Sequence, residues 1–185
     1  MKTKSILSVL LAVVLLSSCK TTEKSTSPVN NSIQNQTQVQ NVEIVTMQSF
    51  VDVKTTMDRL EKMISLDKGI KLFNRINHAE NSKKTGAANV LDNELIIFGN
   101  PKVGLKMLNQ DQKVGLDLPL KIVAYKAKDG KVYVSYRAVS YFSNIYNLEN
   151  CKAQEMMNNK LIKISNIITK SPDDFKLFMQ KSKKK

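Results

Sequence analysis

The sequence predicts an α+β fold, with a mainly antiparallel sheet of about five strands and helices on one face. Short apolar runs with strand-like alternation recur between segments with helical spacing. Asp129-Gly130 lies between two alternating runs, which is the typical signal of a hairpin. Near the C-terminus an apolar stripe predicts a long amphipathic helix, through Met157, Leu161, Ile164 and Ile168. The predicted order is strand, helix, strand, loop, strand, helix, strand, strand, helix.

The folded domain is expected over residues 43–170, and its first element is a strand over residues 43–54. Val51 and Val53 share one face of this strand. Thr55 is a candidate helix start, because Asp58 stands where the acidic partner of a capping box belongs.

The next elements follow from one apolar stripe and one alternating run. Helical spacing continues to Ile64, and Gly69 is expected to end this helix as its C-cap. Residues 70–76 alternate as a half-buried strand. Residues 77–89 are polar and predict a loop that includes one helical turn.

The second half of the domain begins with residues 94–98, an apolar run that predicts an interior strand. Asn100 is a good N-cap and Pro101 a good first residue for a helix that ends near Leu108. Residues 118–126 and 131–136 form the predicted hairpin. Helical spacing starts at Tyr141 and is expected to stop at Ser171-Pro172.

The N-terminus has the three parts of an export signal. Lys2 and Lys4 precede a mostly apolar run of about eleven residues, too short to span a bilayer. Two serines then precede Cys19, and this arrangement resembles the lipobox of bacterial lipoproteins. The resemblance implies a signal peptide over residues 1–18 and cleavage before Cys19. It also implies diacylglyceryl attachment to the Cys19 sulfur and acylation of the new N-terminus, with palmitate as the expected fatty acid. An ordinary cleaved signal with an incidental cysteine is the alternative.

The segments that flank the domain are polar. Residues 19–42 predict a flexible tether, rich in Thr, Ser, Asn and Gln, that holds the domain off a membrane. Residues 171–185 predict a basic tail, either solvated or resting on anionic lipid. The net charge is +13, and loss of Lys2 and Lys4 with the signal leaves +11. Nucleic acid is not an expected partner, because the signal predicts export to the cell envelope.

Three further features concern partners and stability. Once Cys19 is lipidated, Cys151 is a lone thiol and no intrachain disulfide can form. Phe73 and Tyr133 are candidates for the sheet face without helices. Because exposed apolar patches often mark interaction surfaces, a homodimer through this face is one hypothesis.

His78 is the chain's only histidine, and it follows a strand at the start of a polar segment. It could form structural hydrogen bonds, bind a ligand or act as an acid–base. One histidine without partners makes a poor zinc site, so we predict no metal and no cofactor.

Asn100 and Lys102 are candidate anion-binding residues, because the helix start places backbone N–H groups beside a lysine. The alternative is simple turn chemistry, with Asn100 as the cap. Asp117 is expected to shape a turn, and the alternative is that it orients His78. Tyr136 and Tyr141 are candidates for the surface beside Asp117, and Tyr136 is also a candidate ligand-binding residue.

Five segments resemble a bacterial and archaeal family known as domain of unknown function 302, over residues 50–148. The segments are Thr56 to Leu60, Phe73 to Ala79, Leu95 to Lys102, Leu116 to Lys121 and Asp129 to Tyr136. The resemblance implies a compact α+β fold similar to the TATA-binding-protein group, often dimeric, with no established activity. The chain departs from the family near Asn93, where many relatives carry threonine.

These observations favour a lipid-anchored envelope protein with a non-catalytic domain for a small ligand or an envelope partner. The expected ligand is small, anionic or amphipathic, and bound near His78 and Asn100. An enzyme that uses His78 as acid–base, oriented by Asp117, is one alternative. A structural envelope protein is the other.

Overall fold

The computed structural model describes residues 43–182, which contain one sheet of five antiparallel strands in the order β1-β5-β4-β3-β2. The strands are β1 (Ile44–Ser49), β2 (Lys71–Asn77), β3 (Asn93–Gly99), β4 (Leu120–Lys126) and β5 (Val132–Arg137). The helices are α1 (Val53–Ser65), α2 (His78–Lys84), α3 (Pro101–Leu108), the 3-10 helix η1 (Gln112–Leu116), α4 (Val139–Ile145), α5 (Lys152–Ile168) and α6 (Pro172–Ser182). The predicted α+β class and antiparallel sheet are confirmed.

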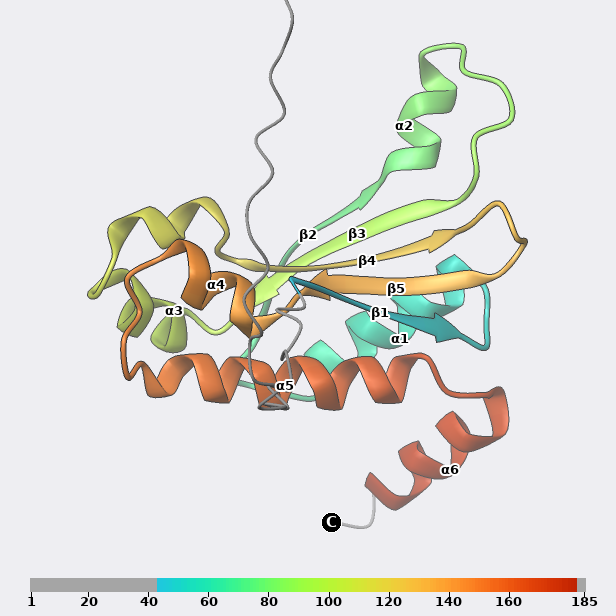
Figure 1. Cartoon of the computed structure of the whole chain (residues 1–185). Coiled ribbons are helices and arrows are strands. Elements are labelled where there is room, and N and C mark those ends of the chain that lie inside the picture. Colours follow the sequence, from blue (N-terminus) through green and yellow to red (C-terminus); the bar gives the residue numbers. More distant parts are fainter. Residues whose placement is uncertain (1–42, 183–185) are drawn as a thin grey trace, which may run out of the picture. The chain divides into compact units, whose positions relative to one another are not determined.

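The two long helices, α1 and α5, lie on the same side of the sheet (Figure 1). Alternate residues of the inner strands are fully buried on that side, among them Ile96, which is paired with Ile122, and Ala124, which is paired with Val134. Apolar side chains of α1 and α5 complete the core, including Met57, Leu60, Leu161 and Ile168. The helix stripes and strand alternation that the sequence predicts therefore meet in one hydrophobic layer.

The β4–β5 hairpin forms where Asp129-Gly130 predicts it. Gly130 has a φ of +81°, a conformation that favours glycine. The Ala127 N–H donates to the Lys131 carbonyl at 2.8 Å, and the Gly130 N–H donates to the Ala127 carbonyl at 3.0 Å. This turn fixes the register in which Ala124 faces Val134.

The predicted boundary between the first strand and the first helix is wrong. β1 ends at Ser49, and α1 begins at Val53 rather than Thr55. Asp52 is the N-cap, because its carboxylate accepts the Thr55 N–H at 2.8 Å. Val53 is buried in the first turn of α1, so this apolar residue belongs to the buried face of the helix and not to a strand.

The first helix also ends before the expected residue. Leu66 is its C-cap, and Gly69 lies in the following turn, where its N–H donates to the Asp67 carboxylate. The polar segment after β2 holds more structure than one helical turn. Asn77 caps it through the Glu80 N–H, and α2 follows.

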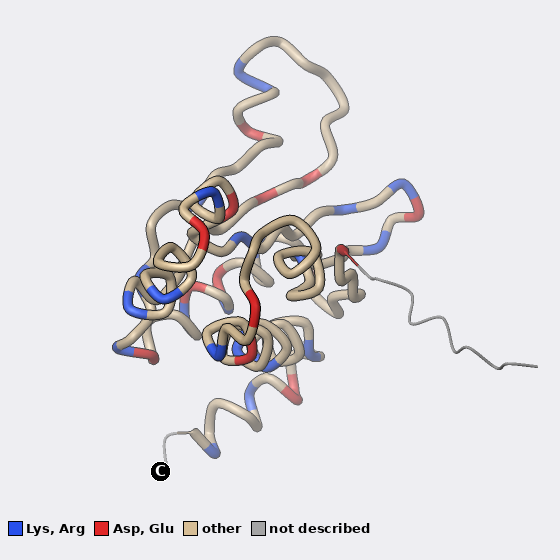
Figure 2. The backbone as a smooth tube through the Cα atoms, turned by 60° about the vertical axis from the view of Figure 1, so that its left-hand side comes forward, with Lys and Arg blue, Asp and Glu red and all other residues tan. Residues whose placement is uncertain are grey.

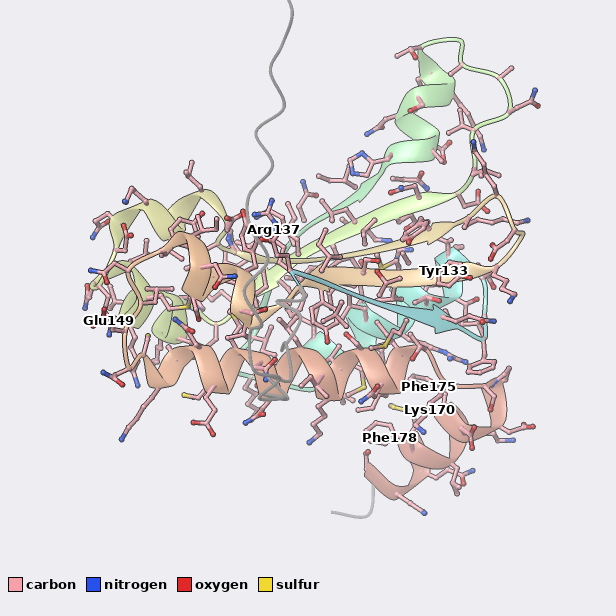
Figure 3. The ribbon with its side chains drawn as sticks, in the orientation of Figure 1. Tyr133, Arg137, Glu149, Lys170, Phe175 and Phe178 are labelled. Carbon is pink, nitrogen blue, oxygen red and sulfur yellow. The ribbon has the colours of Figure 1, made fainter. Side chains whose placement is uncertain are left out.

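The C-terminal region differs most from the prediction. Helical structure occurs as two separate helices, α4 and α5, and residues 172–182 of the expected basic tail form α6. Phe175 and Phe178 lie between α6 and α5 (Figure 3). The Phe175 ring also stacks on the Arg59 guanidinium, whose carbon lies 4.3 Å from the ring centroid. The last three lysines, the signal, Cys19 and the tether lie outside the described residues.

Charged residues are interspersed along the described chain. Lysine and arginine positions are mixed with acidic ones over helices, strands and loops (Figure 2). Arg75 of β2 illustrates this mixture, because it forms ion pairs with Asp58, Glu61 and Glu94.

Candidate functional site

An apolar cavity of about 720 Å³ lies beside α3, at the end of the sheet where β3 ends and β4 begins. Its volume falls within the range of small-molecule sites in proteins, which is roughly 300–1,000 Å³. Most of its lining is aliphatic, aromatic or methionine, with contributions from Phe73, Val103, Leu105, Leu118, Leu120 and Met156. We call it the α3 cavity.

Local sequence explains why α3 forms one wall. The Asn100 side-chain oxygen accepts the Lys102 N–H at 2.9 Å, and Pro101 is the first helical residue. This confirms the predicted helix and its cap. Asn100 also lines the cavity, whereas Lys102 does not line it and is exposed.

Two helical glycines line the cavity. A Cβ atom at Gly104 of α3 would meet Leu118 Cδ1 at 3.7 Å, which is ordinary contact. A Cβ atom at Gly115 of η1 would meet Leu108 Cδ2 at 3.5 Å. Alanine therefore fits at both positions, but a longer side chain at Gly104 would extend into space that the cavity now occupies.

The polar part of the lining is an ion pair between the turn after α1 and the middle of α5. Lys160 Nζ lies 2.6 Å from an Asp67 carboxylate oxygen. The hydrogen bond from Lys160, helped by the Gly69 N–H, lowers the pKa of Asp67. The α3 cavity thus combines apolar walls with one charged pair and the Asn100 side chain, the composition that suits an amphipathic molecule.

A second polar cluster surrounds Asp117, which precedes β4. Arg137 of β5 and Tyr146 after α4 both donate to its carboxylate, one to each oxygen. Arg137 also stacks on the Tyr141 ring, with its guanidinium carbon 4.3 Å from the ring centroid. The hydrogen bond to Asp117, together with burial, raises the pKa of Tyr146 to about 12.

This cluster changes the interpretation of Asp117. We expected a local bond that shapes the turn, but its carboxylate bonds to distant residues instead. The local bonds come from Lys121, whose ammonium donates to the carbonyls of Asp117 and Pro119 at 3.0 Å each. Burial lowers the pKa of Lys121. The cluster fastens the start of β4 to β5 and to the segment after α4.

The structure does not bring His78 to the other candidates. His78 follows Asn77, which pairs with Glu94 at the start of β3, whereas Asn100 and Asp117 lie beyond the other end of β3. Gly99 lies five positions after Glu94, which is about 17 Å at the rise of a strand. His78 is exposed and does not line the α3 cavity. A joint site for His78 and Asn100, and the orientation of His78 by Asp117, are therefore wrong.

Tyr136 also lies away from the cavity. It is only 5% exposed, on the sheet face that α1 and α5 cover, and burial raises its pKa. Its role as a ligand-binding candidate is replaced by a role in the core. Cys151 is half-buried as the N-cap of α5 and packs against the core.

Sequence reasoning found Asn100 but missed the rest of the cavity. The weak signals were Gly104 inside a helix, where alanine would stabilise more, and the adjacent methionines Met156 and Met157. Within residues 43–182, no group of three or more His, Cys, Asp or Glu side chains is placed to hold a metal ion.

The fold and the cavity define an α+β domain with one helix-covered sheet face. The chain belongs to the family described as "Domain of unknown function DUF302", whose model matches residues 45–164. A solved structure of an uncharacterized conserved DUF302 protein from Bacillus stearothermophilus has a TM-score of 0.61 and 16% identity, over 70% of this chain and 99% of that chain. That likeness shows the shared fold.

Longer curated proteins match part of the chain. "Fluoride-specific ion channel FluC 1" of Brucella suis biovar 1 is 30% identical over 105 residues, which are 57% of this chain and 41% of that protein. "Fluoride-specific ion channel FluC 2" of Brucella melitensis biotype 1 is also 30% identical over 105 residues, 38% of its length. The chain thus spans about two fifths of these relatives. Among residues 43–182, none of the helices has the length and apolar character to cross a membrane.

Proposed function

We propose that this chain is a lipid-anchored cell-envelope protein whose domain binds a small amphipathic molecule in the α3 cavity, without catalysis. The observation that carries the binding role is an apolar cavity of about 720 Å³ that also contains Asn100 and the Asp67–Lys160 pair. A cavity of this kind shelters a hydrocarbon group while its polar edge orients a head group.

The binding role is tested by filling the cavity. The probe is 1-anilinonaphthalene-8-sulfonate, an amphipathic anion that fluoresces in apolar surroundings. Gly104→Phe places a ring in the space beside Leu118 and should weaken probe binding at least tenfold. Lys106→Phe adds the same ring at an exposed position of α3 and is the matched control. Equal probe binding by Gly104→Phe, with an unchanged unfolding midpoint, would contradict the role and favour a structural envelope protein.

The envelope role rests on the run from Met1 to Cys19, which resembles a lipoprotein signal. We expect cells fed an alkyne-bearing palmitate to label the wild-type chain, and the chain to partition with membranes. Cys19→Ser should lose both the label and the membrane partition, whereas Cys151→Ser should keep both. Labelling that persists in Cys19→Ser would place any acyl chain elsewhere.

We also propose that the sheet face opposite α1 and α5 pairs with a second copy of the chain. This face carries Leu95 and Val123, which are directly paired, beside the contact between the Tyr125 and Tyr133 rings, whose centroids are 6.0 Å apart. An apolar stripe of this kind suits a self-complementary interface. Sedimentation at tens of micromolar tests it, and Val123→Lys should turn a dimer into a monomer. A wild-type monomer under these conditions would exclude the dimer.

An enzyme that uses His78 is not our proposal, because His78 and Asp117 lie at opposite ends of β3. Nucleic acid is also not proposed as the partner, since the predicted export signal removes the chain from the chromosome.

A further inference from the structure

A second cavity, of about 370 Å³, lies between α6 and the body of the domain, and we call it the α6 cavity. Its apolar lining comes from α1, α5 and α6, including Met63, Ile164, Phe178 and Met179. The α6 helix packs loosely, because none of its side chains is fully buried.

The two cavities share part of their lining. Asp67, Ile70 and Lys160 line both the α3 cavity and the α6 cavity. The Asp67–Lys160 ion pair therefore belongs to the walls of both cavities, and we call this shared wall the junction. Side-chain exposures of 35% for Asp67 and 40% for Lys160 leave this pair free to adjust around an occupant.

The charges at the junction are unbalanced. Lys62 and Lys163 line the α6 cavity together with Lys160, whereas Asp67 is the one acidic residue among the described residues that line it. The positive charge of Lys163 also helps to lower the pKa of Asp67, so the two groups are electrostatically coupled. Of the lysines in the described part of the chain, only Lys160 lines the α3 cavity. Positive charge thus gathers at the α6 side, and the α3 side is the apolar end.

The apolar walls suit a linear chain. Met107, Met156 and Met157 line the α3 cavity, and Met63 and Met179 line the α6 cavity. Unbranched thioether side chains adapt their shape to a flexible occupant. A long chain that passes the ion pair could occupy both spaces, whereas a compact ring system would occupy one.

We infer that the two cavities form one groove that takes a single unbranched hydrocarbon chain with an anionic head group. The head lies at Lys62 and Lys163, and the chain passes the Asp67–Lys160 pair into the α3 cavity. This inference rests on the proposed function and extends it, because it specifies the shape and the charge of the ligand. A fatty acid and a single-chain phospholipid share this chemistry.

Chain length and head charge test the groove. We would use the chain from residue 19 onward with Cys19→Ser, which needs no detergent, and displace the fluorescent probe below micelle concentrations. Straight-chain carboxylates from octanoate to tetradecanoate should bind about fourfold more tightly for each added methylene. Alkyltrimethylammonium ions of equal length should bind at least tenfold more weakly. Alkyl phosphates should bind with the same affinity as the carboxylates if the site recognises only the negative charge of the head group. They should bind more tightly than the carboxylates if the site recognises a phospholipid.

Two variants locate the ends of the ligand. Replacing both Lys62 and Lys163 by Gln should weaken dodecanoate about tenfold and leave dodecanol unchanged. The matched control replaces Lys126 and Lys128, on the distant hairpin, by Gln. Gly104→Phe should weaken tetradecanoate more than octanoate, because it shortens the space for the tail.

The outcomes separate this inference from the proposed function. Probe binding that needs the open α3 cavity, but with no dependence on chain length or head charge, would overturn the groove and leave the binding role intact. Probe binding that is unchanged in Gly104→Phe would overturn both the groove and the binding role. If the double lysine variant lost equal affinity for dodecanoate and for dodecanol, the head group would not lie at Lys62 and Lys163.

Discussion

The Tyr146 hydroxyl donates a hydrogen bond to the carboxylate of Asp117, a residue that precedes it by 29 positions in the chain. Arg137 donates to the other carboxylate oxygen. The Asp117 side chain is 10% exposed and Tyr146 is 7% exposed, so little water can replace these bonds. We therefore infer that these two hydrogen bonds to Asp117, which we call the clasp, stabilise the wall beside the α3 cavity.

Loss of this clasp should destabilise the fold. Asp117→Ala should lower the free energy of unfolding by about 1–3 kcal/mol, because it leaves the Tyr146 hydroxyl without its acceptor. Asp129→Ala is the control, since Asp129 bonds to Tyr133 at an exposed turn, and this substitution should cost clearly less than Asp117→Ala. Urea unfolding measures both. Equal costs would show that the Asp117 bonds contribute no more than surface contacts.

The same clasp predicts a dependence on alkaline pH. The pKa of Tyr146 rises from 10.0 to about 12 in the folded state, which means that folding favours the neutral phenol. This contribution to stability is complete below about pH 10, and it is lost as the pH rises from 10 to about 12. Tyr146→Phe should lack this loss. The difference in tyrosinate absorbance between wild type and Tyr146→Phe gives the titration curve of Tyr146. A midpoint near pH 10 in this curve would contradict the hydrogen bond to Asp117.

The attachment of α6 depends on Arg59. Arg59 is 7% exposed and donates to the carbonyls of Ile168 and Lys170, at 3.2 and 2.6 Å. Phe175→Ala should release α6 and speed amide exchange over residues 173–182, while global unfolding changes by about 1 kcal/mol or less. Leu177→Ala, on the exposed side of the same helix, should leave exchange unchanged. Similar exchange in all three proteins would refute the anchoring role of the ring.

The cap of α3 gives a further prediction. Asn100→Ala should lower the free energy of unfolding by about 1 kcal/mol, because the N–H groups of Lys102 and Val103 lose their acceptor. Asn100→Asp keeps an acceptor and should retain most of the stability. An equal loss in Asn100→Asp and Asn100→Ala would mean that the side-chain NH2 group, which both variants lack, matters more than the capping oxygen.

Local rules predicted much of this fold. The hairpin at Gly130 and the helix after Asn100 depend on residues close in sequence, and both are confirmed. The first helix start failed for a local reason, because two candidate caps lie three residues apart. Asp52, and not Thr55, leaves Val53 on the buried face.

The site depended on contacts that no local pattern contains. His78 directly follows β2, and Asn100 directly follows β3. Because β2 and β3 pair in antiparallel fashion, these two residues lie at opposite ends of the strand pair. The α3 cavity needs α5 and the turn at Asp67, which lie far from α3 in the chain. Likewise, helix α6 is stabilised by Arg59, more than 100 residues earlier, and not by its own sequence alone.

Methionine methyl resonances give the most direct test of ligand binding in the α3 cavity. Titration of the Cys19→Ser chain with dodecanoate should shift the signals of Met107, Met156 and Met157, which line this cavity. The signals of Met47 and Met57, on β1 and in the core under the sheet, should stay in place. Shifts confined to Met47 and Met57, or no shift of any methionine at saturating dodecanoate, would contradict the proposal that this family member holds an amphipathic ligand beside α3.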